Sequence, residues 1–143
     1  MASHWDITDN ELKWQLERIR AAVIAGGPWV MHLYQNDYVP APGSSEGDYV
    51  ESTFPGYVPS PIDVSTFGVV TVLNHIAKTQ NTVQCVFTAD PTGFVEQSVT
   101  GYFVTDDSDT YIYGEAFASA VTIHPDETLK VTPILRLGTY PNP

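Results

Sequence analysis

The side chains in this sequence with the most direct capacity for chemistry are its histidines. His32 and His75 fall in apolar, alternating stretches, and His124 precedes a proline in the turn-like stretch "HPDE". Their separations match no metal-ligand pattern such as HExxH or paired CxxC. We therefore expect structural or solvated histidines, with neither a metal nor a cofactor.

The only cysteine, Cys85, lies in "TVQCVFTA", where Val83, Cys85 and Phe87 fall on the same face of an alternating strand. A single cysteine excludes a disulfide within the chain. No neighbour in the sequence is placed to activate a thiolate, and a GxSxG elbow is absent. Cys85 is therefore expected to be a small buried apolar residue.

The acidic stretch "DDSD" is a third candidate for chemistry. Asp106, Asp107 and Asp109 could supply oxygen ligands to calcium, but the twelve-residue calcium loop is missing. Aspartate also favours hairpin turns, which is the expectation here. Because no catalytic constellation is visible, we predict a non-enzymatic protein with no catalytic residues.

Length and charge limit the classes that remain. The 143 residues, 43% of them hydrophobic, predict one folded domain over 1–143. The net charge is −11, and residues 35–129 hold thirteen acids with Lys78 as their only base, which would repel nucleic acid. No apolar run reaches the roughly 20 residues of a membrane span, and the signal-peptide pattern is absent. We expect neither nucleic acid nor membrane as a partner.

One amphipathic helix is predicted over residues 9–25. Thr8 can cap its start with Glu11 three residues on, and Gly26 and Gly27 follow its end. The apolar residues recur at helical spacing: Leu12, Leu16, Ile19 and Val23. This stripe must be buried on the chain's own sheet or against a neighbouring subunit, and Trp14 lies off it.

From Trp29 the hydrophobic period changes to two, which predicts strands. The stretches are "WVMHLY", "FGVVTVLNHIA", "TVQCVFTA", "VTGYFVT", "TYIYGEAF" and "LKVTPILRL". Turn signals stand at 78–81, 90–93, 106–109 and 124–127. Pro133 inside the last stretch indicates an edge position or a bulge. The pattern predicts a mainly β fold: an antiparallel β-sandwich or partly open barrel with a core at 62–138 and the helix attached.

The segment from Leu33 to Pro61 has the composition of a linker, with five prolines, three glycines and four serines, but it also carries four tyrosines and a phenylalanine. Too little chain precedes it to form a second domain. We therefore predict an extended, ordered arm over 35–61 that packs on its own domain or on a neighbouring chain. The candidate partner-binding residues are Trp14, Tyr38, Tyr49, Phe54 and Tyr57.

Several separated motifs resemble a family of small structural proteins encoded by tailed phages and prophages. They are Leu33-Tyr34, Asn36-Asp37, Pro40 and Pro42, Asp48-Tyr49-Val50-Glu51 with Phe54, Gly56 and Tyr57, then Gly101-Tyr102-Phe103-Val104 and the closing Val131-Thr132-Pro133. The resemblance covers about residues 28–138, and none of the motifs is a catalytic signature.

The resemblance implies a virion component of a bacteriophage, in particular a capsid decoration or cement protein on the outer capsid surface. Its partner would then be the major capsid protein, and a homo-oligomer, a dimer or trimer, would be expected. The alternative is a tail, baseplate or fibre component, or a glycan-binding β-sandwich module of the virion. In that case Tyr111 and Tyr113, on one face of their strand, could stack on sugars.

Overall fold

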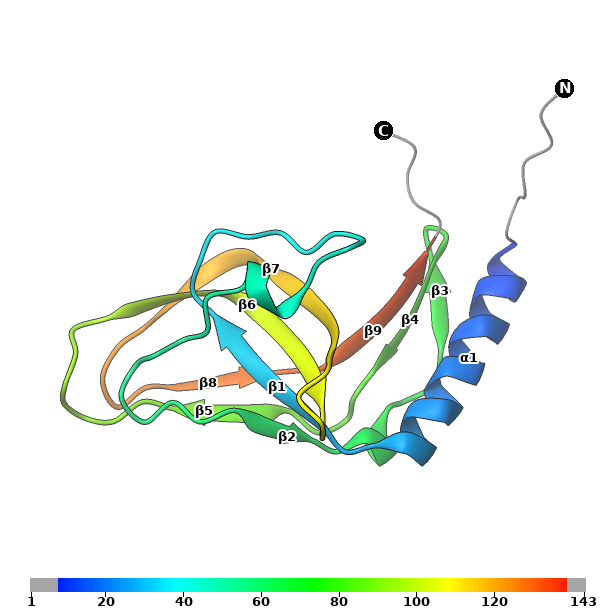
Figure 1. The fold of residues 1–143 in the computed structure, drawn as a ribbon. Coiled ribbons are helices and arrows are strands. Elements are labelled where there is room, and N and C mark those ends of the chain that lie inside the picture. The colour runs from blue at the N-terminus through cyan, green and yellow to red at the C-terminus, as the bar shows by residue number, and fades with distance from the viewer. Residues whose placement is uncertain (1–7, 139–143) are drawn as a thin grey trace, which may run out of the picture. The chain divides into compact units, whose positions relative to one another are not determined.

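The computed structural model describes residues 8–138. Over these residues the fold is mainly β, with one helix near the N-terminus and antiparallel sheets that do not close into a barrel, which confirms the predicted fold class. The chain separates into two compact units (Figure 1). Unit 1 takes in 8–27, 63–83 and 132–138, and unit 2 takes in 28–62 and 84–131. The single domain over 1–143 stays a prediction, which one cooperative unfolding transition would support.

Unit 1 is a helix packed on a small sheet. The helix α1 (Asp9–Gly26) begins at Thr8, whose hydroxyl accepts the Glu11 amide at 3.2 Å. The sheet has the order β3-β4-β9, formed by β3 (Thr71–Leu73), β4 (Ile76–Gln80) and β9 (Ile134–Gly138). Leu12, Leu16 and Val23 are buried, and α1 lies along this sheet (Figure 1). The helix stripe is thus covered within its own unit, except at Ile19, which is 42% exposed.

The turn between β3 and β4 lies where the sequence predicted a continuous strand. Asn74 and His75 have φ of 53° and 62° and join Leu73 to its partner Ile76, which is the geometry of a two-residue hairpin turn. The sequence predicted one strand through 67–77 and a turn at 78–81, and both expectations were wrong. Asn tolerates positive φ, so the chain reverses at Asn74 and β4 continues to Gln80.

Pro133 interrupts the last predicted strand. The stretch "LKVTPILRL" forms β8 (Thr128–Val131) in unit 2 and β9 in unit 1, with Pro133 between them. Proline has no amide hydrogen to continue a ladder. Its carbonyl instead accepts the Asn81 amide at 2.9 Å, next to the end of β4.

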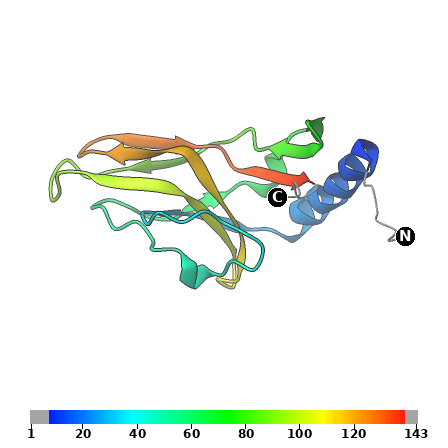
Figure 2. The same cartoon turned by 90° about the horizontal axis from the view of Figure 1, so that it is seen from above.

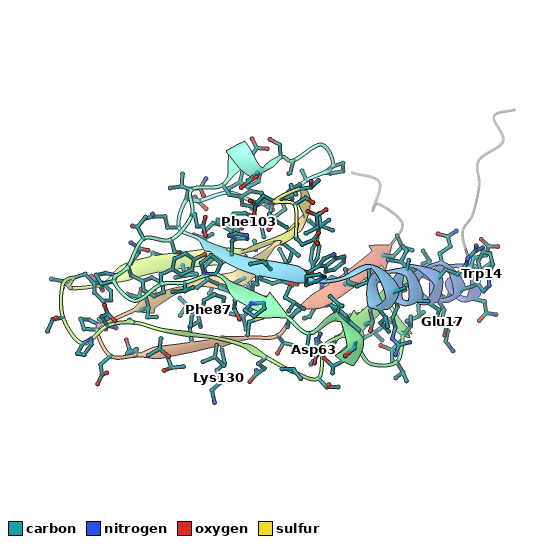
Figure 3. The ribbon with its side chains drawn as sticks, turned by 60° about the horizontal axis from the view of Figure 1, so that its bottom comes forward. Trp14, Glu17, Asp63, Phe87, Phe103 and Lys130 are labelled. Carbon is teal, nitrogen blue, oxygen red and sulfur yellow. The ribbon has the colours of Figure 1, made fainter. Side chains whose placement is uncertain are left out.

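Unit 2 contains a four-stranded antiparallel sheet in the order β2-β1-β6-β7. Its strands are β1 (Trp29–Tyr34), β2 (Ser60–Ile62), β6 (Gln97–Asp106) and β7 (Tyr111–Ile123). A separate ribbon pairs β5 (Cys85–Thr88) with β8. Cys85 and Phe87 are buried on the ribbon as expected, and burial raises the pKa of the Cys85 thiol (Figure 3 labels Phe87). Val83, expected on the same face, precedes β5 and is 48% exposed.

The acidic turn after β6 is held by hydrogen bonds between backbone amides and the Asp106 side chain. The Asp106 carboxylate accepts the amides of Ser108 at 2.8 Å and Thr110 at 2.9 Å. Asp109 adopts a φ of 60° beside it. This is the aspartate-stabilised hairpin turn that the sequence predicted.

Candidate partner-binding site

The arm folds back onto unit 2 and contributes to its core. Tyr34, Tyr49 and Phe103 form a buried cluster, with Tyr38 and Tyr111 packed against it. The Tyr49 ring stacks on Phe103 with centroids 4.7 Å apart, and Tyr38 meets Tyr49 edge-on at 5.1 Å. Figure 2 shows this segment, coloured cyan to green with the short helix η1 (Glu46–Asp48) in it, beside the strands of unit 2. The tyrosines of the arm thus find their cover within the same chain.

Two glycines in the sheet make room for two tyrosines. His32, Phe103 and Gly114 lie opposite one another on β1, β6 and β7, and the first two rings stack at 4.7 Å. The third position, Gly114, has no side chain, and the Tyr49 ring occupies the space above it. A Cβ at Gly114 would overlap the Tyr49 hydroxyl and lie 2.8 Å from Tyr49 Cζ. Tyr34 covers Gly101 in the same way, and a Cβ there would lie 2.7 Å from the Tyr34 ring. These contacts fix the register of the arm on the sheet.

We expect Gly114→Ala to lower the free energy of unfolding by about 2 kcal/mol, because the new methyl group displaces Tyr49. In a chain that already carries Tyr49→Ala, Gly114→Ala should leave the free energy of unfolding almost unchanged, because the Tyr49 ring is no longer there to be displaced. Urea denaturation of the two single variants and the double variant measures this coupling. Additive costs in the double variant would mean that Tyr49 does not lie over Gly114.

The backbone of the arm is held by an extension of the β1 pairing. β2 pairs with the first residues of β1, and Glu51 pairs with Tyr34 at the other end of β1 in an antiparallel bridge. The Gln35 amide donates to the Val50 carbonyl at 2.8 Å, and the Ser52 amide donates to the Leu33 carbonyl at 2.9 Å.

Asn36 adds two further bonds to this pairing. Its Nδ2 donates to the Asp48 carbonyl at 3.0 Å, and its Oδ1 accepts the Val50 amide at 2.8 Å. The side chain therefore takes the place of a strand residue and ties both ends of the 37–47 loop together.

The second half of the arm is anchored by Tyr57. Its hydroxyl donates to Glu51 Oε2 at 2.6 Å and accepts the Leu33 amide at 3.0 Å. Its ring stacks on Phe87 with centroids 6.0 Å apart, and Phe54 packs edge-on against it at 5.3 Å. Burial, followed by the bond to Glu51, raises the pKa of Tyr57 well above its usual range. Tyr57 is thus a neutral donor that locks the arm to β1.

His32 belongs to the same polar network. Its Nδ1 lies 2.8 Å from Glu51 Oε2, and its Nε2 lies 2.9 Å from Thr105 Oγ1. Both ring nitrogens are engaged, so neither is directed at a substrate position. His32 is therefore a structural histidine, as predicted.

The other two predicted histidines make surface pairs. His75 Nδ1 lies 2.9 Å from Asp9 Oδ1, which joins the β3–β4 turn to the start of α1 within unit 1. His124 Nδ1 lies 2.6 Å from Glu127 Oε1 and its Nε2 lies 3.4 Å from Glu96. Hydrogen bonds from His124 lower the pKa of Glu127. Both histidines are solvated, as expected.

The tyrosine cluster predicts a loss of stability in alkali. Burial raises the pKa of Tyr34 to about 12 and raises those of Tyr49 and Tyr111 as well. In the unfolded chain tyrosines ionise near pH 10, so the unfolded state then binds fewer protons than the folded state. The stabilisation is therefore complete below pH 10 and disappears as the pH rises through about 12.

Absorbance at 295 nm and far-UV circular dichroism, recorded on one alkaline titration, measure this effect. We expect the tyrosines of the cluster to ionise together with unfolding, above the pH at which exposed tyrosines titrate. Ionisation of all eight tyrosines near pH 10 with the fold intact would contradict the buried cluster.

The structure divides the five predicted partner-binding residues by their exposure. Tyr49 and Phe54 are 7% and 2% exposed and belong to the core of unit 2, so they support the arm from within, and contact with a partner stays a prediction for them. Tyr38 and Tyr57 are half-buried and hold the arm with their rings and hydroxyls. Trp14 is 54% exposed on α1, with the Arg18 guanidinium 4.8 Å from its ring centre (Figure 3).

The sequence reading missed the residues that the arm presents to solvent. Val39, Val50 and Val58 are 72%, 52% and 69% exposed. Each directly follows a tyrosine that faces the core, so the arm repeats the dipeptide Tyr-Val three times with the ring inward and the valine outward. If these dipeptides are taken as extended backbone, the exposed valines can be predicted, because successive side chains of an extended segment point to opposite sides.

Tyr111 and Tyr113 lie in contacts that leave little room for a sugar. The Tyr111 hydroxyl lies 2.6 Å from that of Tyr49. Tyr113 contacts the rings of Trp29 and Tyr102, each with centroids 6.1 Å away, and burial raises its pKa well above the usual value. Both tyrosines are thus held by contacts within unit 2, and the glycan-binding alternative stays a prediction.

Comparison of the chain with protein-family models, curated proteins and solved structures gave no match. Within residues 8–138, the acids, histidines and cysteine form no group of three that could hold a metal ion. In the same part of the chain, the single helix lacks the length and apolar content needed to cross a bilayer.

Proposed function

We propose that this chain is a non-enzymatic structural protein of a tailed-phage virion, specifically a decoration protein that binds the major capsid protein on the outer surface of the head. One observation carries the proposal. The motifs that resemble the phage family coincide with the residues that fasten the arm: Tyr34 over Gly101, Asn36 across the loop, and Tyr49 and Tyr57 in the core.

This coincidence supports a binding role for the arm. A proline-rich segment that is already fixed loses little conformational entropy when a partner covers it. The arm then offers the exposed apolar side chains of Val39, Val50 and Val58 on a fixed support.

The test compares particles of the encoding phage or prophage with and without this gene. Heads that contain the protein should retain their DNA at a higher temperature than heads that lack it. Purified protein added back should restore that resistance, and a Val50→Asp variant that folds normally should not. Thr53→Asp, at an exposed position of the arm away from the three valines in sequence, is a control for the added charge.

Two results would overturn the proposal. The first is that purified particles never contain the protein, and the second is that its removal leaves head stability unchanged. Recovery of the protein with isolated tails instead of heads would favour the alternative of a tail, baseplate or fibre component.

A further inference from the structure

The sheet of unit 1 has one face under α1 and one face that α1 leaves open. Ala77, Thr79 and Leu135 are buried on the helix side. Because side chains alternate along a strand, their neighbours point to the opposite side. We define the open face by five of these neighbours: Thr71, Leu73, Ile76, Lys78 and Arg136.

Strand pairing arranges the open face in two rows. Leu73 lies opposite Ile76, which makes an apolar row at the hairpin end, and the two are 75% and 41% exposed. Lys78 lies opposite Arg136, which makes a cationic row beside it. Among the described residues, Lys78 pairs with no carboxylate.

The two rows line an open hollow of about 270 Å³, and Asn74 lines it at the turn. Ligand pockets for small molecules usually have about 300–1,000 Å³, so this hollow is at or below the lower end of that range. Its size suits one or two side chains of a polypeptide. The two-residue turn holds the apolar row rigidly, which lowers the cost of binding.

Charge on the two units differs sharply. The described residues of unit 1 contain four acids and five bases, whereas unit 2 contains twelve acids and Lys130 as its only base. At physiological ionic strength, charges act over about 8 Å, so a ligand on the open face responds mainly to Lys78 and Arg136. The open face is therefore a place on this acidic chain where an anionic side chain is attracted.

We propose that the open face of unit 1 is a docking site for an extended acidic segment of another protein, with carboxylates at the cationic row and apolar side chains at Leu73 and Ile76. Acidic and apolar residues two positions apart point to the same side of an extended segment, so one such segment can reach both rows. Nucleic acid offers anions without the apolar side chains. A second copy of this chain brings a net charge of −11 against one that is equally negative. The inference does not depend on the proposed role in a phage head.

The test uses a short fluorescein-labelled peptide with the repeat Asp-Ser-Val-Ser, which puts aspartate and valine on the same side of an extended chain, with a peptide that has serine in place of aspartate as the reference. We expect the full chain to bind the acidic peptide by fluorescence anisotropy, and to bind it more weakly as salt rises. Lys78→Glu should weaken binding by about tenfold or more. Lys130→Glu makes the same charge change on β8 of unit 2 (Figure 3) and should change binding by less than about twofold.

Amide chemical shifts of the unaltered protein give a second measurement that needs no variant to fold. The acidic peptide should perturb the amides of 71–78 and 134–138 and leave those of β8 unchanged. Equal binding of the two peptides, equal effects of the two lysine variants, or shifts confined to unit 2 would each overturn the proposal. Self-association that Leu73→Ser abolishes would also overturn it, because a second copy would then occupy the face.

Discussion

Replacing Tyr49 by alanine should lower the free energy of unfolding by about 3–5 kcal/mol, the usual cost of removing a buried aromatic ring. The ring is 7% exposed and touches Tyr34, Tyr38, Phe103 and Tyr111 at once. Its loss would open a cavity above Gly114 that the neighbouring strands cannot close. Denaturant unfolding followed by tyrosine and tryptophan fluorescence measures the change.

Tyr49→Phe is the matched control for this prediction. It keeps the ring and removes only the 2.6 Å contact with the Tyr111 hydroxyl, so its cost should be about 1 kcal/mol. If Tyr49→Ala cost no more than Tyr49→Phe, the ring would not be part of the core. The arm would then be a loosely attached segment, as its composition alone suggests.

The second large effect is expected at Gly101. In Gly101→Ala the new Cβ would overlap the Glu115 carbonyl oxygen on β7 and lie 2.7 Å from the Tyr34 ring. Neither group can move freely, because one is backbone in a sheet and the other donates its hydroxyl to the Tyr38 carbonyl at 2.7 Å. We expect a loss of about 3 kcal/mol, at the upper end for overpacking, with a lowered melting temperature.

Gly47→Ala tests whether the effect at Gly101 is specific. Gly47 lies in η1, and a Cβ there would meet only the Ser45 hydroxyl at 3.9 Å. Its replacement should change stability by less than about 0.5 kcal/mol. Equal melting temperatures for the two glycine variants would show that Tyr34 does not lie over Gly101.

Local patterns in the sequence predicted the elements that depend on local chemistry. The alternation in "WVMHLY" predicted β1 with its observed bounds, and the Thr8 cap predicted the start of α1. The turn at Asn74 was missed because the apolar residues on its two sides read as one continuous strand. Pro133 was read as an edge position or a bulge within one strand, but it lies between two strands, β8 and β9.

The inward position of the arm could not be predicted in the same way. It depends on Gly101 and Gly114, which lie about 50 or more residues from the tyrosines that cover them. A glycine in a strand often marks close approach of another group, but the sequence does not say which group approaches. Tyr38, Tyr49 and Tyr57 therefore suggested a contact surface for a partner, and the valines that follow them in the sequence were overlooked.

The central structural claim is that the arm is folded in the free chain, and native-state hydrogen exchange tests it most directly. The amides of Gln35, Val50 and Ser52 donate to groups within unit 2, so they should be protected to a degree similar to the amide of Phe103 in β6. Exchange of these three amides at the rate of a free peptide, with β6 still protected, would contradict the account.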